Sequence, residues 1–307
     1  MQNMNMIRTA EKASVEFARL LQKDPGGRGL LSGTVGDRTK GLAQSLARAR
    51  RAVLLTGFPV RRFDGEVVGE TDGPSGTANI AFALEECGAE VVALTDRFCF
   101  PQLKAALKAR GARSEAVMIP DNTAPEFFKD LFRGLSPTHL ITLERPGKAR
   151  DGHFYNMRGI QIDALLTDTD SIIQEARQAN TNIISVGDGG NELGMGALRP
   201  LIEEGVPQGG LICADAAADV TLVSGVSNWW GWGIAAVCSI IYGKDLLPTP
   251  ETEQEMLRAV IASGGADGCT GLMEETVDGL PARLHLSLLE ELRDSAGAFP
   301  GCDRLSD

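Results

Sequence analysis

Short β-branched runs alternate with helical stretches from residue 52 onward, and this alternation constrains the fold more than any other feature of the sequence. The runs are apolar on both faces, which is typical of strands that helices cover on both sides. Strand–helix alternation of this kind predicts a parallel or mostly parallel sheet. The expected strands are 52–58, 90–95, 115–120, 139–144, 182–187 and 219–224.

The intervening stretches place apolar residues at helical spacing. The expected helices are 75–87, 101–110, 124–133, 169–179, 195–204 and 228–242, with two more near 251–262 and 281–295. The sequence thus predicts a single α/β domain over 1–307: a doubly wound, mostly parallel sheet flanked by helices on both faces. A helical N-terminal extension (1–50), a core sheet (51–245) and a helical tail (246–307) are its expected parts.

A glycine-rich stretch, DPGGRGLLSGTVGD at 24–37, interrupts the N-terminal extension between two helical segments. Glycine at this density weakens regular structure. We interpret the stretch as a surface connection, and a ligand-binding loop is the alternative.

The charge balance and the cysteines exclude several classes of protein. The formal net charge is −11, which argues against binding of a nucleic-acid backbone as the main function. None of the six cysteines forms a CxxC pair, so reduced thiols are expected rather than a disulfide framework. No run reaches the roughly 18 apolar residues of a membrane span, and 229–243 is expected to be a buried helix. We expect a cytoplasmic protein rather than a mitochondrial one, because no clear signal or transit peptide is visible.

The ligand of a doubly wound sheet binds outside the carboxyl ends of its strands. GETDGPSGT (69–77) follows the first strand and reads as a tight loop entering a helix, which Ser75 or Thr77 could cap. Such a helix end can hold an anion, and the expected anion ligands are Gly73, Ser75 and Gly76. The acids Glu70 and Asp72 would repel an anion unless a divalent cation lies between. An acidic turn with a helix cap is the alternative.

A long polar loop, LERPGKARDGHFYNMRGIQID (143–163), follows the fourth strand. Arginine forks match carboxylates, so Arg145 and Arg158 are candidates for holding a substrate carboxylate, with Asn156 beside them. Glu144, at the strand's carboxyl end, is a candidate catalytic residue. The alternative is an ordinary solvated loop.

The fifth strand runs into SVGDGGNELGMG (185–196), which combines five glycines with two acids and an asparagine. Carboxylate and amide oxygens on one small loop suit Mg²⁺ or Mn²⁺, and the absence of His and Cys argues against zinc. Neither a P-loop nor a dinucleotide fingerprint is present. Asp188, Gly189, Gly190, Asn191 and Glu192 are therefore candidate ligand and metal residues. An acidic turn before a helix is the alternative.

SNWWGWG (227–233) follows the sixth strand. Asn228 or Ser227 could cap the helix that begins there. The tryptophans are expected to pack the helix against the sheet, and the alternative is an apolar wall at a pocket, with Asn228 and Trp229 contacting substrate.

These four stretches, in this order, resemble the D-glutamate cyclase family, over roughly residues 40–290. The resemblance implies conversion of D-glutamate to 5-oxo-D-proline with loss of water. Some archaeal-type relatives are described as manganese- or magnesium-dependent phosphatases, and larger members carry an extra N-terminal domain and are mitochondrial.

The resemblance and the residues together suggest roles as hypotheses. Asp188 and Glu192, with Glu70 or Asp72, would hold Mn²⁺ or Mg²⁺ as a Lewis acid. Glu144, with Asp188 and Asp72, would form the catalytic set, and Glu144 would act as general base. A phosphohydrolase on the same site and a non-catalytic protein that binds a small anion remain open. We expect a small-molecule partner, no nucleic acid and no membrane, and the sequence leaves a homo-oligomer open.

Overall fold

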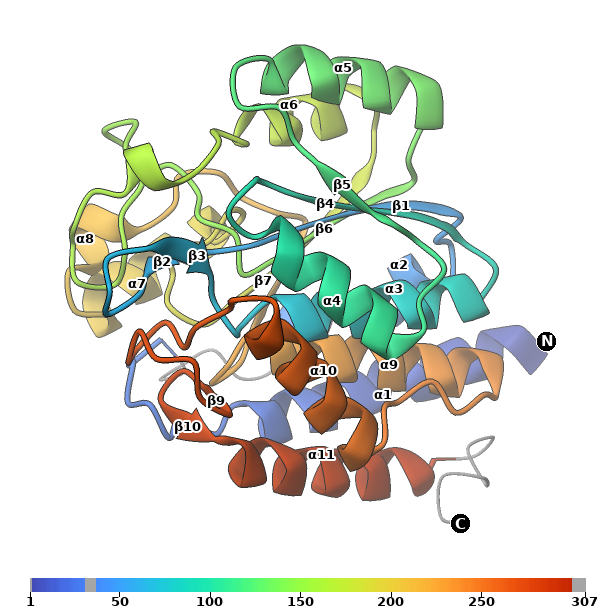
Figure 1. Cartoon of the computed structure of the whole chain (residues 1–307). Coiled ribbons are helices and arrows are strands. Elements are labelled where there is room, and N and C mark those ends of the chain that lie inside the picture. The colour runs from blue at the N-terminus through green and yellow to red at the C-terminus, as the bar shows by residue number, and fades with distance from the viewer. Residues whose placement is uncertain (1, 31–36, 300–307) are drawn as a thin grey trace.

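The computed structural model describes residues 2–30 and 37–299, and its centre is a six-stranded parallel sheet (Figure 1). The strands are β1 (Arg51–Thr56), β4 (Glu90–Thr95), β5 (Ala116–Met118), β6 (His139–Leu143), β7 (Asn182–Gly187) and β8 (Val220–Val223). Their order is β5-β4-β1-β6-β7-β8, and every neighbouring pair is parallel. The chain order reverses between β1 and β6, which is where such sheets bind ligands. The predicted α/β fold is confirmed.

Strand β1 illustrates why these runs form a two-sided buried sheet. Ala52 and Leu54 belong to the larger apolar cluster on one face, and Val53 and Leu55 belong to the cluster on the other face. Alternate side chains of a strand point to opposite faces, so a run that is apolar throughout is buried only when both faces are covered. The helices provide that cover.

The helices form unequal layers around the sheet (Figure 1). One face is covered by α5 (Ala124–Leu135) and α6 (Ser171–Gln178). The other is covered first by α3 (Pro74–Glu86), α4 (Phe100–Arg110) and α9 (Asn228–Tyr242). Behind these lie α1 (Gln2–Leu21), α10 (Pro250–Ala262) and α11 (Ala282–Gly297), so α9 is buried along nearly its whole length, as predicted.

Several short elements depart from the sequence prediction. The expected helix 195–204 is a 3₁₀ turn, η3 (Gly196–Leu198), followed by α7 (Arg199–Gly205), and the segment after residue 40 forms only α2 (Leu42–Leu46). Further short helices are η1 (Asp37–Thr39), η2 (Asp163–Leu165) and α8 (Gly209–Ile212). Two hairpins, β2 (Pro59–Arg61) with β3 (Val67–Gly69) and β9 (Thr276–Val277) with β10 (Leu280–Pro281), were not predicted. Strands of two or three residues are too short to show an alternating pattern.

The glycine-rich stretch 24–37 is only partly described, because 31–36 lie outside the described residues. Residues 24–30 run from the end of α1 toward the carboxyl edge of the sheet. The tip of this connection enters the functional site described below, so its interpretation as a simple surface connection is wrong for Arg28.

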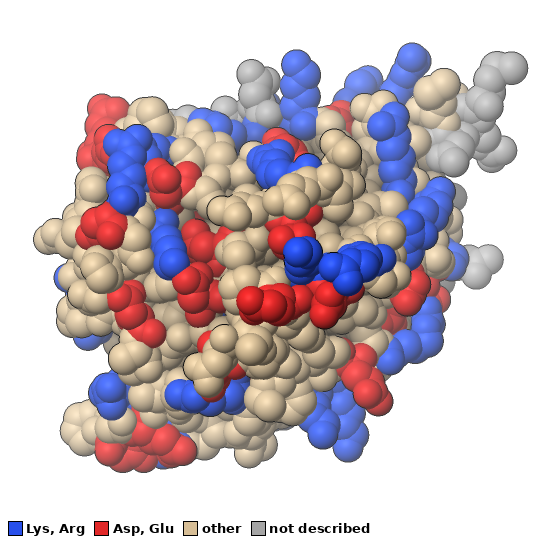
Figure 2. All heavy atoms as spheres, turned by 90° about the horizontal axis from the view of Figure 1, so that it is seen from above, with Lys and Arg blue, Asp and Glu red and all other residues tan. Residues whose placement is uncertain are grey.

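Two further observations concern the apolarity of the helices and the charges on the surface. Within 2–30 and 37–299, no helix is both long and apolar enough to cross a membrane. Figure 2 views the molecule from the side that α5 covers in Figure 1, and acidic and basic side chains are interspersed on that face. Arg133 and Asp130 of α5, for example, form an ion pair at 3.2 Å.

Helices α3 and α9 cross at a point where both carry a glycine, so no side chain separates their backbones. A Cβ atom added to Gly231 would lie 2.4 Å from the Cα of Gly76, well inside any real contact. Glycine at both positions therefore lets the two helices approach more closely than any side chain would allow. This close approach brings the N-termini of α3 and α9 side by side at the carboxyl edge of the sheet.

Replacing Gly231 with alanine should therefore destabilise the protein by about 1–3 kcal/mol, the usual cost of overpacking a core. The matched control is Gly134→Ala in α5, where an added Cβ meets nothing within 4 Å. That substitution should be neutral or slightly stabilising, because alanine favours helix more than glycine does. Urea unfolding of both variants measures the difference, and equal stabilities would contradict the proposed close contact.

Candidate functional site

A cavity of about 650 Å³ opens at the carboxyl ends of β1, β6 and β7, next to the point where the strand order reverses. We call it the central cavity. Its charged lining comes from elements distant in sequence, and the charged residues nearest its floor are Arg28, Glu70, Glu144, Asp188 and Asp278. The fold thus gathers strand-end loops, the N-terminal connection and the β9–β10 turn around one space.

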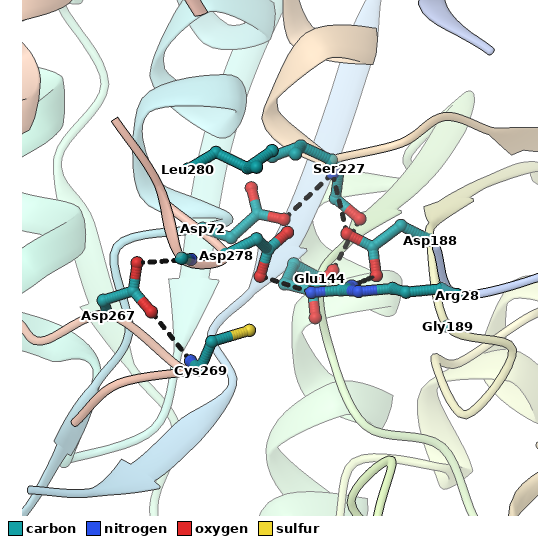
Figure 3. Close-up of polar contacts among 12 residues, drawn as sticks. Arg28, Asp72, Glu144, Asp188, Gly189, Ser227, Asp267, Cys269, Asp278 and Leu280 are labelled. Carbon is teal, nitrogen blue, oxygen red and sulfur yellow. Dashed lines mark hydrogen bonds and ion pairs between the residues drawn. The ribbon is translucent and has the colours of Figure 1, made fainter. Parts of the chain in front are cut away.

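Three buried carboxylates converge at this cavity, from Asp72, Glu144 and Asp188. Glu144 and Asp188 line it, and Asp72 lies close to both. One oxygen of each lies within 4.8 Å of one oxygen of each of the others. Figure 3 shows them pointing toward one another from three different loops. We call these three residues the carboxylate cluster.

Ser227, just before α9, ties the carboxylate cluster together. Its hydroxyl donates to Oε2 of Glu144 at 2.5 Å, and its backbone N–H is shared by Asp72 at 2.9 Å and Asp188 at 3.2 Å (Figure 3). Glu144 reaches this position because its backbone, one residue past β6, has a left-handed φ of 46°. A glutamate rarely adopts that conformation, so the surrounding contacts hold it there.

The N-termini of α3 and α9 cap each other. Asp72, before α3, accepts from the N–H groups of Ser227 and Asn228 at 2.9 and 2.8 Å. In return, Oδ1 of Asn228 accepts from the N–H groups of Gly73 and Gly76 at 2.9 and 2.7 Å. The expected local cap of α3 is therefore wrong, because the cap comes from the other helix. Both positive helix ends lie next to the carboxylate cluster and favour its ionised state.

Arg28 enters the site from the N-terminal connection. Its Nη1 pairs with Oδ1 of Asp188, and its Nη2 lies 2.5 Å from Oδ1 of Asp278 (Figure 3). Burial lowers the pKa of Arg28, but the facing charges, led by those of Asp278 and Glu144, outweigh that effect and raise it above its ordinary value. The guanidinium is therefore a permanent cation among the acids.

The acids of the site are difficult to ionise together. Burial, and then the neighbouring negative charges, raise the pKa of Glu70, of Asp72 and of Glu144 well above the ordinary carboxyl values. Burial also raises the pKa of Asp278. Perturbed carboxyl groups in a cavity are typical of functional sites, and the excess of buried negative charge favours a bound cation.

Arg145 does not lie in the central cavity. It is fully buried and pairs with Asp96 at 2.6 Å. Its remaining donors contact the carbonyl oxygens of Gly57 and Thr167 and the hydroxyl of Thr169. The preceding Glu144 faces the cavity with a left-handed backbone, φ 46°, and the turn at that residue directs Arg145 away from the cavity. The predicted substrate contact of Arg145 is thus corrected to a structural ion pair beneath the site.

The carboxylate of Glu192 forms hydrogen bonds within its own loop. Its carboxylate accepts from the N–H groups of Asp188 and Gly189 at 2.9 and 2.7 Å, and from that of Gly190 at 2.7 Å. Glu192, which was predicted to bind a metal, therefore stabilises the turn of its own loop through these hydrogen bonds. The glycines allow that turn: Gly190 has φ 95°, and a Cβ added to Gly189 would lie 2.4 Å from Sδ of Met157. Both glycines are closely packed against the protein, and their role as ligand contacts stays a prediction.

The remaining predicted residues divide between the cavity wall and the interior. Asn156, Arg158 and Asn191 line the central cavity. Ser75 and Asn228 border a separate, much smaller cavity beside α10, and Trp229 is buried with its indole N–H donating to His285 at 2.9 Å. The tryptophan is thus a packing residue, as the favoured interpretation of its motif predicted.

The carboxylate cluster fits a hard divalent cation. Its donors are carboxylate oxygens, which Mg²⁺ and Mn²⁺ prefer. Glu70 and Asp278 add two further carboxyl groups to the same cavity, where Arg28 supplies one compensating charge close to them. Oδ2 of Asp278 is buried and has no hydrogen-bond partner among the described residues.

Sequence reasoning missed Arg28, Ser227 and Asp278 as members of the site. A visible signal existed for the last, because Asp278–Gly279 is a hairpin dipeptide, and both residues have positive φ, 57° and 73°. Arg28 stands alone among glycines, and nothing in the local sequence predicts that it reaches a strand end about 160 positions away.

Comparison with known proteins identifies relatives of the chain. The family described as D-glutamate cyclase-like, C-terminal, matches residues 17–293. Human mitochondrial D-glutamate cyclase is 28% identical over 325 aligned positions, covering 91% of this chain and 51% of that protein. The chain therefore spans about half the length of this relative.

A solved structure of an exopolyphosphatase-related protein from Bacteroides fragilis also aligns, with 10% identity and a TM-score of 0.38. The alignment covers 85% of this chain and 58% of the chain of the solved structure. A likeness this distant carries no argument about the activity of the chain.

The structural role of Arg145 can be tested by substitution. Arg145→Met should destabilise the protein by about 3–5 kcal/mol, because it leaves Asp96 charged, buried and unpaired. Adding Asp96→Leu should recover part of that loss. Chemical denaturation measures both effects, with Arg158→Ala on the cavity wall as a control of unchanged stability. If Arg145→Met unfolds like the wild type but no longer binds substrate, Arg145 is a ligand after all.

Proposed function

We propose that this chain, which belongs to the D-glutamate cyclase-like family, converts D-glutamate to 5-oxo-D-proline with loss of water. The observation that carries the proposal is the convergence of three buried carboxylates, from Asp72, Glu144 and Asp188, at the cavity next to the switch point of the sheet. The human relative is named D-glutamate cyclase, and the chain matches its family over most of its length.

Cyclisation joins two groups of one molecule. The α-amine nitrogen attacks the carbon of the γ-carboxylate, a C–N bond forms, and one C–O bond of that carboxylate breaks. Two of the three ammonium protons leave with the departing oxygen as water. The site must therefore remove protons from nitrogen, deliver them to oxygen and hold both groups in contact, which by itself gives effective molarities of about 10⁵ M or more.

Position within the site suggests how these tasks are divided. Asp72, Glu144 and Asp188 together would hold a divalent cation, Mn²⁺ or Mg²⁺. When bound, such a cation polarises a carboxylate as a Lewis acid. Ser227 keeps Glu144 in place through the 2.5 Å hydrogen bond from its hydroxyl.

Glu70 is the better-placed general base. It lines the cavity, it is buried, and it contributes no oxygen to the carboxylate cluster. We therefore exchange two roles relative to the sequence hypothesis, in which Glu144 was the base and Glu70 a ligand. Glu70 takes two protons in turn from the substrate nitrogen and delivers each to the leaving oxygen, which departs as water.

The direct test uses purified, metal-stripped protein. D-glutamate, L-glutamate and an aryl phosphate are each incubated with and without Mn²⁺, and 5-oxoproline and free phosphate are measured. We expect lactam from D-glutamate, much less from L-glutamate, and a strong increase on adding Mn²⁺. Phosphate release without lactam would assign the site to a phosphohydrolase, and binding of D-glutamate without turnover would indicate a binding protein.

Two substitutions separate the base from the cation ligands. Glu70→Gln should lower kcat by about 10²–10⁴-fold, the usual contribution of a general base, and leave Mn²⁺ affinity nearly unchanged. Glu144→Gln should weaken Mn²⁺ binding by about tenfold or more, because one anionic ligand is lost. Calorimetric titration with Mn²⁺ and initial rates check both. The reverse pattern would restore Glu144 as the base.

A further inference from the structure

Arg28 has a position that the carboxylate cluster alone does not explain. It is carried by a loop after α1, yet its guanidinium lies inside the central cavity with its side chain only 18% exposed. Asp188 contacts it from one side and Asp278 from the other (Figure 3). At this depth the guanidinium of Arg28 is hydrated little by solvent, so its charge acts on the groups inside the cavity.

The loop that carries Arg28 is fixed on both sides. Asp24 accepts from the backbone N–H groups of Arg28 and Gly29 at 3.1 and 3.2 Å. Gly29 has φ 86°, and a Cβ there would lie 2.3 Å from the carbonyl oxygen of Gly205, so only glycine fits. The backbone is thus set before the side chain enters the cavity.

The β9–β10 turn fixes the far side of the guanidinium. Asp278 stands at the first position of the turn, and Asp267 accepts from the N–H of Gly279 at 2.7 Å. Asp278 therefore presents its carboxylate from a braced hairpin. Two rigid supports orient the planar fork of Arg28, which reduces the entropy lost when it binds a further anion.

Among the described arginines of the central cavity, Arg28 lies nearest the carboxylate cluster. Arg62 pairs with Asp64 and Glu66, whose side chains are more than half exposed, and Arg158 is itself exposed. A guanidinium carries five N–H donors. The two ion pairs of Arg28 engage one nitrogen each, and one further hydrogen bond goes to the side chain of Cys269. Donors remain for a substrate carboxylate next to the reacting groups.

We propose that Arg28 is the carboxylate-binding half of the substrate site and holds the α-carboxylate of D-glutamate, with Asp278 as the residue that positions it. This inference rests on the proposed function. The amine and the γ-carboxylate must meet at the carboxylate cluster and Glu70, so the α-carboxylate is the group that remains for Arg28. The arrangement makes Arg28 a determinant of specificity for dicarboxylates over monocarboxylates.

Two unreactive or poorly reactive ligands test this without relying on turnover. Glutarate carries a second carboxylate, and 4-aminobutanoate lacks the α-carboxylate but keeps the amine and the other carboxylate. Arg28→Ala should weaken glutarate binding by about 10- to 100-fold, as expected for a lost charged hydrogen bond, and change the affinity for 4-aminobutanoate by less than about threefold. Calorimetry measures both affinities.

Further variants separate binding from folding. Arg28→Lys keeps the charge but loses the fork and should fall between the wild type and Arg28→Ala. Added guanidinium ion should restore part of the glutarate affinity of Arg28→Ala and none in the wild type. Asp278→Asn should raise the KM for D-glutamate by about tenfold with little change in kcat.

The matched control is Arg199→Ala. Arg199 also pairs with two carboxylates, Glu203 and Asp215, its side chain is 10% exposed, and it lies outside the lining of the central cavity. Its loss should lower stability and leave glutarate affinity unchanged.

Three outcomes overturn the inference: wild-type protein that does not bind glutarate, equal loss of affinity for both ligands in Arg28→Ala, or no loss for either. If the wild type binds glutarate through Arg28 but forms no lactam from D-glutamate, the proposed function fails and the carboxylate-binding site stands. If lactam forms and Arg28→Ala has an unchanged KM, the function stands and this inference fails.

Discussion

The reciprocal capping of α3 and α9 is the interaction on which the site depends. Asp72 accepts from the first N–H groups of α9, and Asn228 accepts from those of α3. Each pairing satisfies donors that a helix end otherwise leaves unpaired. The contact is possible only because Gly76 and Gly231 let the helices touch backbone to backbone. Packing in the core thereby determines the placement of a carboxylate at the edge of the sheet.

Buried negative charge is the second constraint, and it links structure to chemistry. Carboxylates gathered away from water repel one another, so they are stable together only with partly protonated members, a bound cation or fixed positive dipoles. The site supplies positive charge from two helix N-termini and from Arg28. Its other acids, Glu70 and Asp278, line the cavity. The same excess of negative charge suits the site to a cation and to the ammonium group of the proposed substrate.

Much of this arrangement was predictable, because it follows from strand ends. Glu144 and Asp188 each follow a strand of the parallel sheet, and parallel strands bring their carboxyl ends to one edge. Asp72 lies between β1 and α3 in the chain, after the β2–β3 hairpin that the sequence did not predict. What the sequence could not provide is side-chain direction. Glu144 enters the cavity because of its left-handed backbone, while its neighbour Arg145 turns away from the cavity and pairs with Asp96, just past the end of β4. Arg28 could not be predicted, since no local pattern records a contact made across about 160 residues.

The most direct measurement is a crystal structure of the protein with Mn²⁺ and 5-oxo-D-proline, with the metal located by anomalous scattering. The account predicts a manganese peak among the oxygens of Asp72, Glu144 and Asp188, the lactam ring beside it, and the product carboxylate on Arg28. A product bound outside the central cavity, or manganese bound away from these three residues, would contradict it.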